Sequence, residues 1–85
     1  MKKKDKIGSF KNKDKPLHIL GIKHGKNGEF FFLVEWEKRS DGIKPDNSHV
    51  SNLDFKTNDP DFLFEFYEKL FFNIILLKAI SNYLI

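Results

Sequence analysis

Residues 60–72 read PDFLFEFYEKLFF and have the pattern of one helix that begins at Pro60. Proline suits the first helical position because its missing N–H has no helical partner there, and the preceding Asp59 is a favourable N-cap. The apolar side chains cover about 200° of the helical wheel, roughly twice what a surface helix of a small domain needs. We therefore expect one half to cover the protein's own core and the other half to meet a partner.

The wheel divides these apolar residues into two stripes. The first stripe spans about 100° and is expected to lie on the sheet; its members are Phe62, Leu63, Phe66 and Leu70. The second stripe lies about 140–200° around the helix and consists of Phe64, Tyr67 and Phe71. Glu65, Glu68 and Lys69 mark the polar side.

Three segments upstream of this helix have strand patterns. Residues 17–22 are rich in aliphatic and β-branched side chains, and residues 29–37 (EFFFLVEWE) alternate between two faces. The turn between them contains Asn27-Gly28, a pair that readily takes positive φ. Residues 48–51 are expected to form a short third strand, followed by one helical turn around residues 53–55. Residues 38–47 are a polar loop.

Together these elements predict an α+β fold, in which a three-stranded antiparallel curved sheet carries a C-terminal helix packed across it. The chain is short enough for one domain, which we place at residues 16–73. The expected core residues alternate along the strands and recur on the first stripe of the helix; they are Ile19, Phe32, Val34, Trp36, Phe66 and Leu70.

Positive charge is concentrated at the N-terminus. Residues 1–15 contain seven lysines and two aspartates, so their net charge is +5. The whole chain has a net charge of +3, so residues 16–85 carry −2. Low apolar content predicts that residues 1–15 are a disordered basic tail. A solvated linker is the simpler interpretation; weak nucleic-acid contact is the functional one, through Lys2, Lys3, Lys4 and Lys6.

Residues 74–85 are unexpectedly apolar. Even when counted from Leu70 onward, the apolar run is shorter than the roughly 20 residues that span a bilayer, and Asn73 and Lys78 interrupt it. We favour a helical extension that packs on the domain or on a partner. A truncated terminus and a membrane tail are the alternatives, and we expect no membrane partner.

The sequence contains no readable catalytic or metal-binding set. His18, His24 and His49 are far apart and lack a ligand at i+2 or i+4, and there is no cysteine. No nucleophile, base and orienting group occur in a recognisable arrangement. We therefore expect a protein that is not an enzyme and that needs no cofactor or metal.

The order of these elements resembles the chromo shadow domain of the heterochromatin protein 1 family over about residues 17–73. The resemblance rests on residues 19–21 (ILG), 28–29 (GE), 32–36 (FLVEW), Val50, and Pro60 opening a helix that carries FYE at residues 66–68. It implies a chromo-like, SH3-like partial barrel in a nuclear, chromatin-binding protein that supports heterochromatin and gene silencing.

The resemblance also implies a homodimer in which the last helix crosses its twin. Its interface would consist of Phe64, Tyr67, Phe71 and Glu68. Family members bind extended Pro-x-Val-x-Leu peptides of chromatin proteins in a groove of the dimer, by β-strand addition. The groove positions here would be Ile22, Lys23, Phe72 and Asn73, where Asn73 replaces the usual Trp.

The related chromodomain reads methylated lysine with three aromatic side chains. Only Trp36 occupies such a position in this chain, because Arg39 stands where a second aromatic residue is expected. One ring binds a quaternary ammonium weakly. A methyl-lysine histone reader is therefore the alternative to the chromo shadow interpretation, as is nucleic-acid binding through the basic tail.

Overall fold

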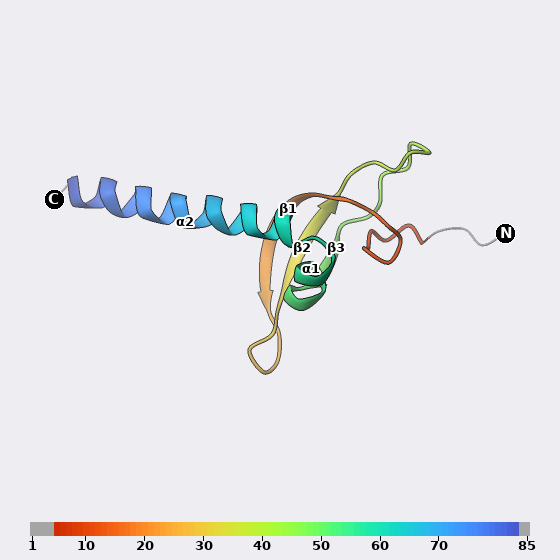
Figure 1. Ribbon diagram of the computed structural model, residues 1–85, viewed down its shortest axis with the longest axis horizontal. Coiled ribbons are helices and arrows are strands. Elements are labelled where there is room, and N and C mark those ends of the chain that lie inside the picture. Colours follow the sequence, from red (N-terminus) through yellow and green to blue (C-terminus); the bar gives the residue numbers. More distant parts are fainter. Residues whose placement is uncertain (1–4, 84–85) are drawn as a thin grey trace.

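The computed structural model describes residues 5–83, with side chains through Ala79. Three strands precede two helices: β1 (Pro16–His24), β2 (Phe30–Trp36), β3 (Ser48–Ser51), α1 (Asn52–Asn58) and α2 (Pro60–Tyr83). The strands form one antiparallel sheet in the order β1-β2-β3. This arrangement confirms the predicted α+β fold, the three strands and the helical turn before α2 (Figure 1).

The hairpin between β1 and β2 closes at the predicted Asn-Gly turn. Asn27 and Gly28 have φ values of 58° and 76°, a conformation that glycine and asparagine adopt most readily. The register pairs Ile19 with Val34 and Ile22 with Phe32. Two register shifts in β1 act as bulges, which bend a strand and increase its twist, so the sheet is curved.

The core lies between the concave face of the sheet, α1 and the first turns of α2. Phe32, Val34, Trp36 and Phe55 have no exposed surface, and Val50 and Leu63 are almost as buried. Ile19 and Phe66 are only partly buried at its margin. Aromatic rings join the elements, since Phe55 of α1 contacts Phe32 edge-on at 5.8 Å and stacks on Phe62 of α2 at 5.7 Å.

A single aspartate connects the two helices. The Asp59 N–H donates to the carbonyl of Phe55 at the end of α1, at 2.9 Å. Its carboxylate Oδ1 accepts from the N–H of Phe62 in the first turn of α2, at 3.2 Å, as the predicted N-cap does. Because neither Gly nor Pro follows Pro60, no stop signal interrupts α2, and it continues for 24 residues.

Helix α2 packs on the domain only through its first turns. Leu63 is buried and Phe62 and Phe66 are half-buried, but Leu70 is 41% exposed. The prediction that Leu70 belongs to the core is therefore wrong. The physical reason is length, because the sheet is narrow and the helix has passed its edge by residue 70. Residues 74–83 continue the same helix away from the sheet (Figure 1).

The N-terminal segment, which we define as residues 5–15, is folded onto the sheet. Ile7 and Asp46 form a parallel bridge, supported by a hydrogen bond from the Gly8 N–H to the Asp46 carbonyl at 3.0 Å. Phe10 contacts both Trp36 and Phe55 edge-on at 5.1 Å. The expected disorder is thus wrong for residues 5–15, because Phe10 enters the core. Lys2, Lys3 and Lys4 lie outside the described residues.

Candidate interaction surface

The second stripe of α2 is exposed as the helical wheel predicts. Phe64 and Phe71 are 64% and 65% exposed, and Glu68 next to them is also exposed. Tyr67 is less so, at 39%, because its ring contacts Phe32 at 6.2 Å. Burial raises the pKa of the Tyr67 phenol above its ordinary value, which favours the neutral form.

A hollow of about 540 Å³ opens beside this stripe, between α1 and α2. Phe64, Tyr67 and Leu63 line one side of it, and Asn52 and Lys56 of α1 line the other. Its wall is thus partly aromatic and already formed. Such a hollow can accept an apolar side chain from a partner that lies along the second stripe.

Beyond its first turns, α2 has apolar side chains all around the helix. Seven large apolar side chains between residues 70 and 77 are 41–67% exposed; they are Leu70, Phe71, Phe72, Ile74, Ile75, Leu76 and Leu77. Contiguous exposed apolar surface of this kind marks an interaction site in a soluble protein. Within residues 5–83, no helix has the length and hydropathy needed to cross a bilayer.

The four predicted groove residues do not come together within one chain. Ile22 and Lys23 are exposed near the end of β1, and Phe72 and Asn73 are exposed in the middle of α2. Figure 1 shows the end of β1 pointing away from the free part of α2. Lys23 instead lines a hollow with the hairpin residues Gly25 and Phe31. A groove made of these four residues therefore requires a second copy of the chain.

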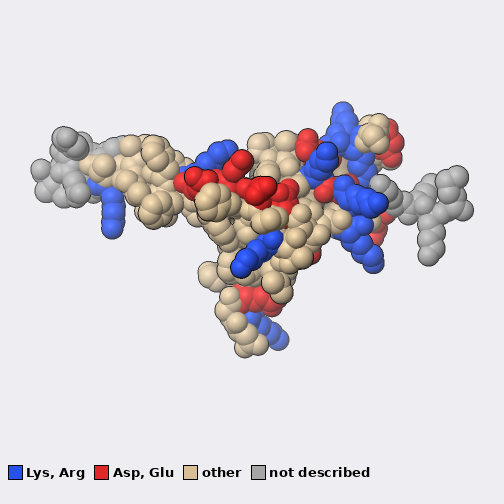
Figure 2. All heavy atoms as spheres, viewed as in Figure 1, with Lys and Arg blue, Asp and Glu red and all other residues tan. Residues whose placement is uncertain are grey.

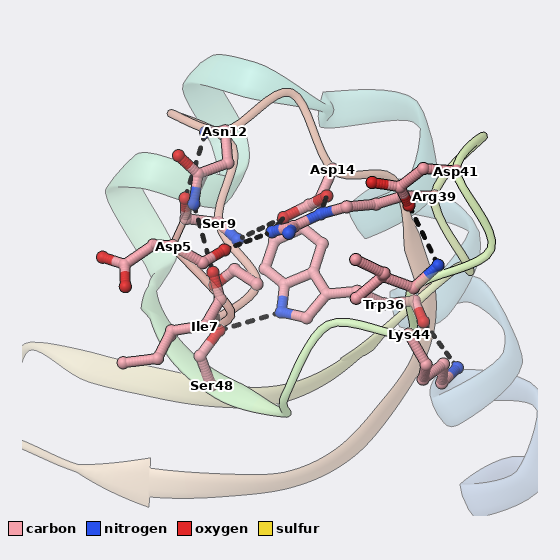
Figure 3. A network of polar contacts seen from close by, with 12 residues as sticks. Asp5, Ile7, Ser9, Asn12, Asp14, Trp36, Arg39, Asp41, Lys44 and Ser48 are labelled. Carbon is pink, nitrogen blue, oxygen red and sulfur yellow. Dashed lines mark hydrogen bonds and ion pairs between the residues drawn. The ribbon is translucent and has the colours of Figure 1, made fainter. Parts of the chain in front are cut away.

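Trp36, the residue for which the resemblance predicts a methyl-lysine cage position, is completely buried. Its Nε1 donates to the Ser48 hydroxyl at 2.8 Å, and that hydroxyl donates to the Gly8 carbonyl at 2.5 Å (Figure 3). A Cβ atom on Gly8 would lie 1.9 Å from Trp36 Cδ1, so the backbone at Gly8 rests directly on the indole. With its ring covered by the chain itself, Trp36 is a core residue.

Arg39 is held beside Trp36 by a buried ion pair. Its Nε and Nη2 donate to the two carboxylate oxygens of Asp14 at 2.8 and 2.9 Å, and the two side chains are 9% and 2% exposed (Figure 3). Nη2 also donates to the Asp5 carbonyl at 2.7 Å. The hydrogen bonds to Asp14 raise the pKa of Arg39, so the guanidinium remains charged.

Sequence reasoning missed the contributions of Gly8, Phe10 and Asp14. The lysines of residues 1–15 lowered the mean hydropathy of the segment, although Ile7 and Phe10 were signals of a packed stretch within it. The ion pair could not be predicted from the sequence, because Asp14 and Arg39 are 25 positions apart. The described part of the chain has no cluster of three or more His, Cys, Asp or Glu side chains that could hold a metal ion.

Searches against protein-family models, curated proteins and solved structures find no match to this chain.

Proposed function

We propose that this protein is a non-enzymatic adaptor that forms a homodimer through α2, in the manner of a chromo shadow domain. The observation that carries the proposal is the exposed second stripe, Phe64, Tyr67 and Phe71, on a helix that leaves the domain after its first turns. Two copies of this stripe, related by a two-fold axis, can bury each other's aromatic side chains. The hollow between α1 and α2 supplies space for a ring from the second copy.

The finer part of the proposal comes from the sequence resemblance. We propose a nuclear, chromatin-associated role in heterochromatin and gene silencing, in which the dimer binds extended Pro-x-Val-x-Leu-like peptides of chromatin proteins. Such a peptide would add a strand to the dimer, and β1 is an edge strand that leaves one side free. Ile22 and Lys23 of one copy would then act with Phe72 and Asn73 of the other.

The dimer can be tested with Phe64→Glu. A charge placed in an apolar interface is desolvated without a partner, so we expect the dimer to weaken by at least about 2 kcal/mol, or roughly 30-fold in Kd. Sedimentation equilibrium over a wide concentration range measures the change. Phe64 is exposed within one chain, so the fold should be unchanged, as the emission of buried Trp36 would report.

Leu53→Glu is the matched control. Leu53 is 69% exposed, a fraction similar to that of Phe64, but it lies on α1 and outside the second stripe. We expect this variant to dimerise like the unmodified chain. A wild-type chain that stays monomeric at tens of micromolar, or equal weakening in both variants, would contradict the proposal.

A further inference from the structure

A second hollow, of about 390 Å³, is lined by residues 12–15 and 37–40 and by no residue of α2. The end of the N-terminal segment forms one wall, and the residues that follow β2 form the other. We call this site the basic hollow. A hydrogen bond from the Glu37 N–H to the Lys15 carbonyl, at 2.8 Å, joins the two walls. The charged residues that line it are Lys13, Asp14, Lys15, Glu37, Lys38 and Arg39.

The charge balance of the basic hollow favours an anion. Lys13, Lys15 and Lys38 form no ion pair with any residue between 5 and 83. Of the two carboxylates, Asp14 lies against the Arg39 guanidinium, which leaves Glu37 as the opposing charge. Figure 2 shows Lys and Arg side chains gathered at the end of the molecule opposite the free part of α2, with some Asp and Glu side chains among them, and further acidic side chains along the start of α2.

Arg39 adds hydrogen-bond donors to the hollow. Asp14 and the Asp5 carbonyl occupy its Nε and Nη2, and the side chain is nine-tenths buried. Its Nη1 group makes no hydrogen bond to the described residues, so two N–H donors remain for a ligand. Guanidinium groups held in this way suit phosphate oxygens, which accept such paired donors.

The backbone that carries these cations is already ordered. The Lys13 N–H donates to the Phe10 carbonyl at 2.9 Å and closes a turn, in which Lys13 adopts a φ of 62°. On the other wall, the Arg39 N–H donates to the Ile43 carbonyl, and the Arg39 carbonyl accepts from the Gly42 N–H, both at 2.9 Å. A ligand therefore does not have to order the chain at this site, which lowers the entropic cost of binding.

We propose that the basic hollow binds phosphate groups of a nucleic-acid backbone. Several separate cations around an open hollow match a chain of phosphates better than a single small anion. Lys6 and Lys11 are further exposed cations on the same N-terminal segment. None of the residues that line the hollow belongs to the second stripe, so a dimer formed by that stripe does not use them.

The test compares two triple variants of the full chain that remove equal charge. Lys13→Gln, Lys15→Gln and Lys38→Gln together change the hollow, whereas Lys26→Gln, Lys69→Gln and Lys78→Gln change exposed lysines elsewhere. Binding of a labelled mixed-sequence DNA duplex is measured by fluorescence anisotropy at about 50 and about 200 mM salt. Each phosphate contact makes affinity fall by about 3.5-fold over that range, so three contacts account for about 40-fold.

We expect the hollow variant to lose this part of the salt dependence, with Kd at low salt raised at least tenfold, and the control to remain close to the unmodified chain. Equal losses in both variants would overturn the proposal. So would binding that disappears in a Lys2→Gln, Lys3→Gln, Lys4→Gln variant but survives in the hollow variant.

Two further measurements separate the alternatives. Lysine-dependent binding to phosphatidylserine vesicles or to inorganic phosphate, without binding to DNA, would overturn a nucleic-acid ligand. Sedimentation equilibrium of the hollow variant should equal that of the unmodified chain, so failure of this proposal is distinct from failure of the dimer. Far-ultraviolet circular dichroism and Trp36 emission establish that each variant is folded.

Discussion

At the scale of single residues, Trp36 organises the contacts between distant parts of the chain. Its indole N–H donates a hydrogen bond to Ser48, the Gly8 backbone covers the ring, and Phe10 contacts the ring edge-on. β2, β3 and the N-terminal segment therefore meet at Trp36. Gly8 is required because no side chain fits between its backbone and the ring. Trp36 is therefore at the centre of the packing.

Gly8→Ala should therefore destabilise the domain. The added Cβ would lie 1.9 Å from Trp36 Cδ1, so the ring or the segment has to move, at a cost of about 1–3 kcal/mol. Urea unfolding followed by Trp36 fluorescence measures it. Gly21→Ala in β1 is the control, because its Cβ meets nothing within 4 Å, and we expect a change within about 0.5 kcal/mol. Equal stability of the two variants would contradict this account of Gly8.

At the scale of elements, α2 consists of two parts with different environments. The first turns are fixed by the Asp59 cap, by buried Leu63 and by the contact between Phe66 and Phe32 at 5.9 Å. The later turns have exposed apolar side chains throughout. Tertiary packing supplies most of the stability of a protein helix, so the later turns need a partner surface to be equally stable.

Phe66→Ala and Phe72→Ala should separate these two parts in the monomer. Loss of the half-buried Phe66 ring is expected to cost about 2 kcal/mol, less than for a fully buried ring. Phe72 is 65% exposed, so its loss should cost less than about 0.5 kcal/mol. Chemical unfolding at low protein concentration is the measurement. Similar costs at both positions would show that the later turns pack on the domain.

At the scale of the whole molecule, the N-terminal segment completes the domain. It pairs with Asp46 near its start and with Glu37 at its end, and between these points Gly8 and Phe10 cover Trp36. The ion pair between Asp14 and Arg39 also links the N-terminal segment to the residues that follow β2. The molecule thus has a basic end built by this segment and an apolar end built by α2 (Figures 1 and 2).

Deleting residues 1–15 should consequently damage the fold itself. Trp36 would lose its cover and the core would lose the Phe10 ring, so we expect a loss of about 2–4 kcal/mol. The emission of Trp36 should shift to longer wavelength. A chain that starts at Asp5 is the control, since it keeps the segment from Asp5 to Lys15. An unchanged stability after the longer deletion would mean that the segment does not support the core.

Local patterns predicted those parts of the fold that depend on neighbouring residues. Alternation along EFFFLVEWE identified β2 and its buried face, Asn27-Gly28 identified the turn, and Asp59-Pro60 identified the start of α2. The helical extension expected after residue 73 is a continuation of α2 to Tyr83, since a helix without Gly or Pro has no local stop. Leu70 was assigned to the core because a helical wheel contains no information about where the sheet ends.

The sequence by itself determined the strands, the helix start and the two stripes of α2, because each follows from the period of a strand or helix and from residues a few positions apart. Only the tertiary structure decided which stripe positions are covered, where residues 5–15 lie, and how Lys13, Lys15 and Lys38 come to surround one hollow. Those outcomes depend on contacts such as Gly8 with Trp36 and Asp14 with Arg39. Pairs so far apart meet only when the whole chain has folded, and no local period predicts them.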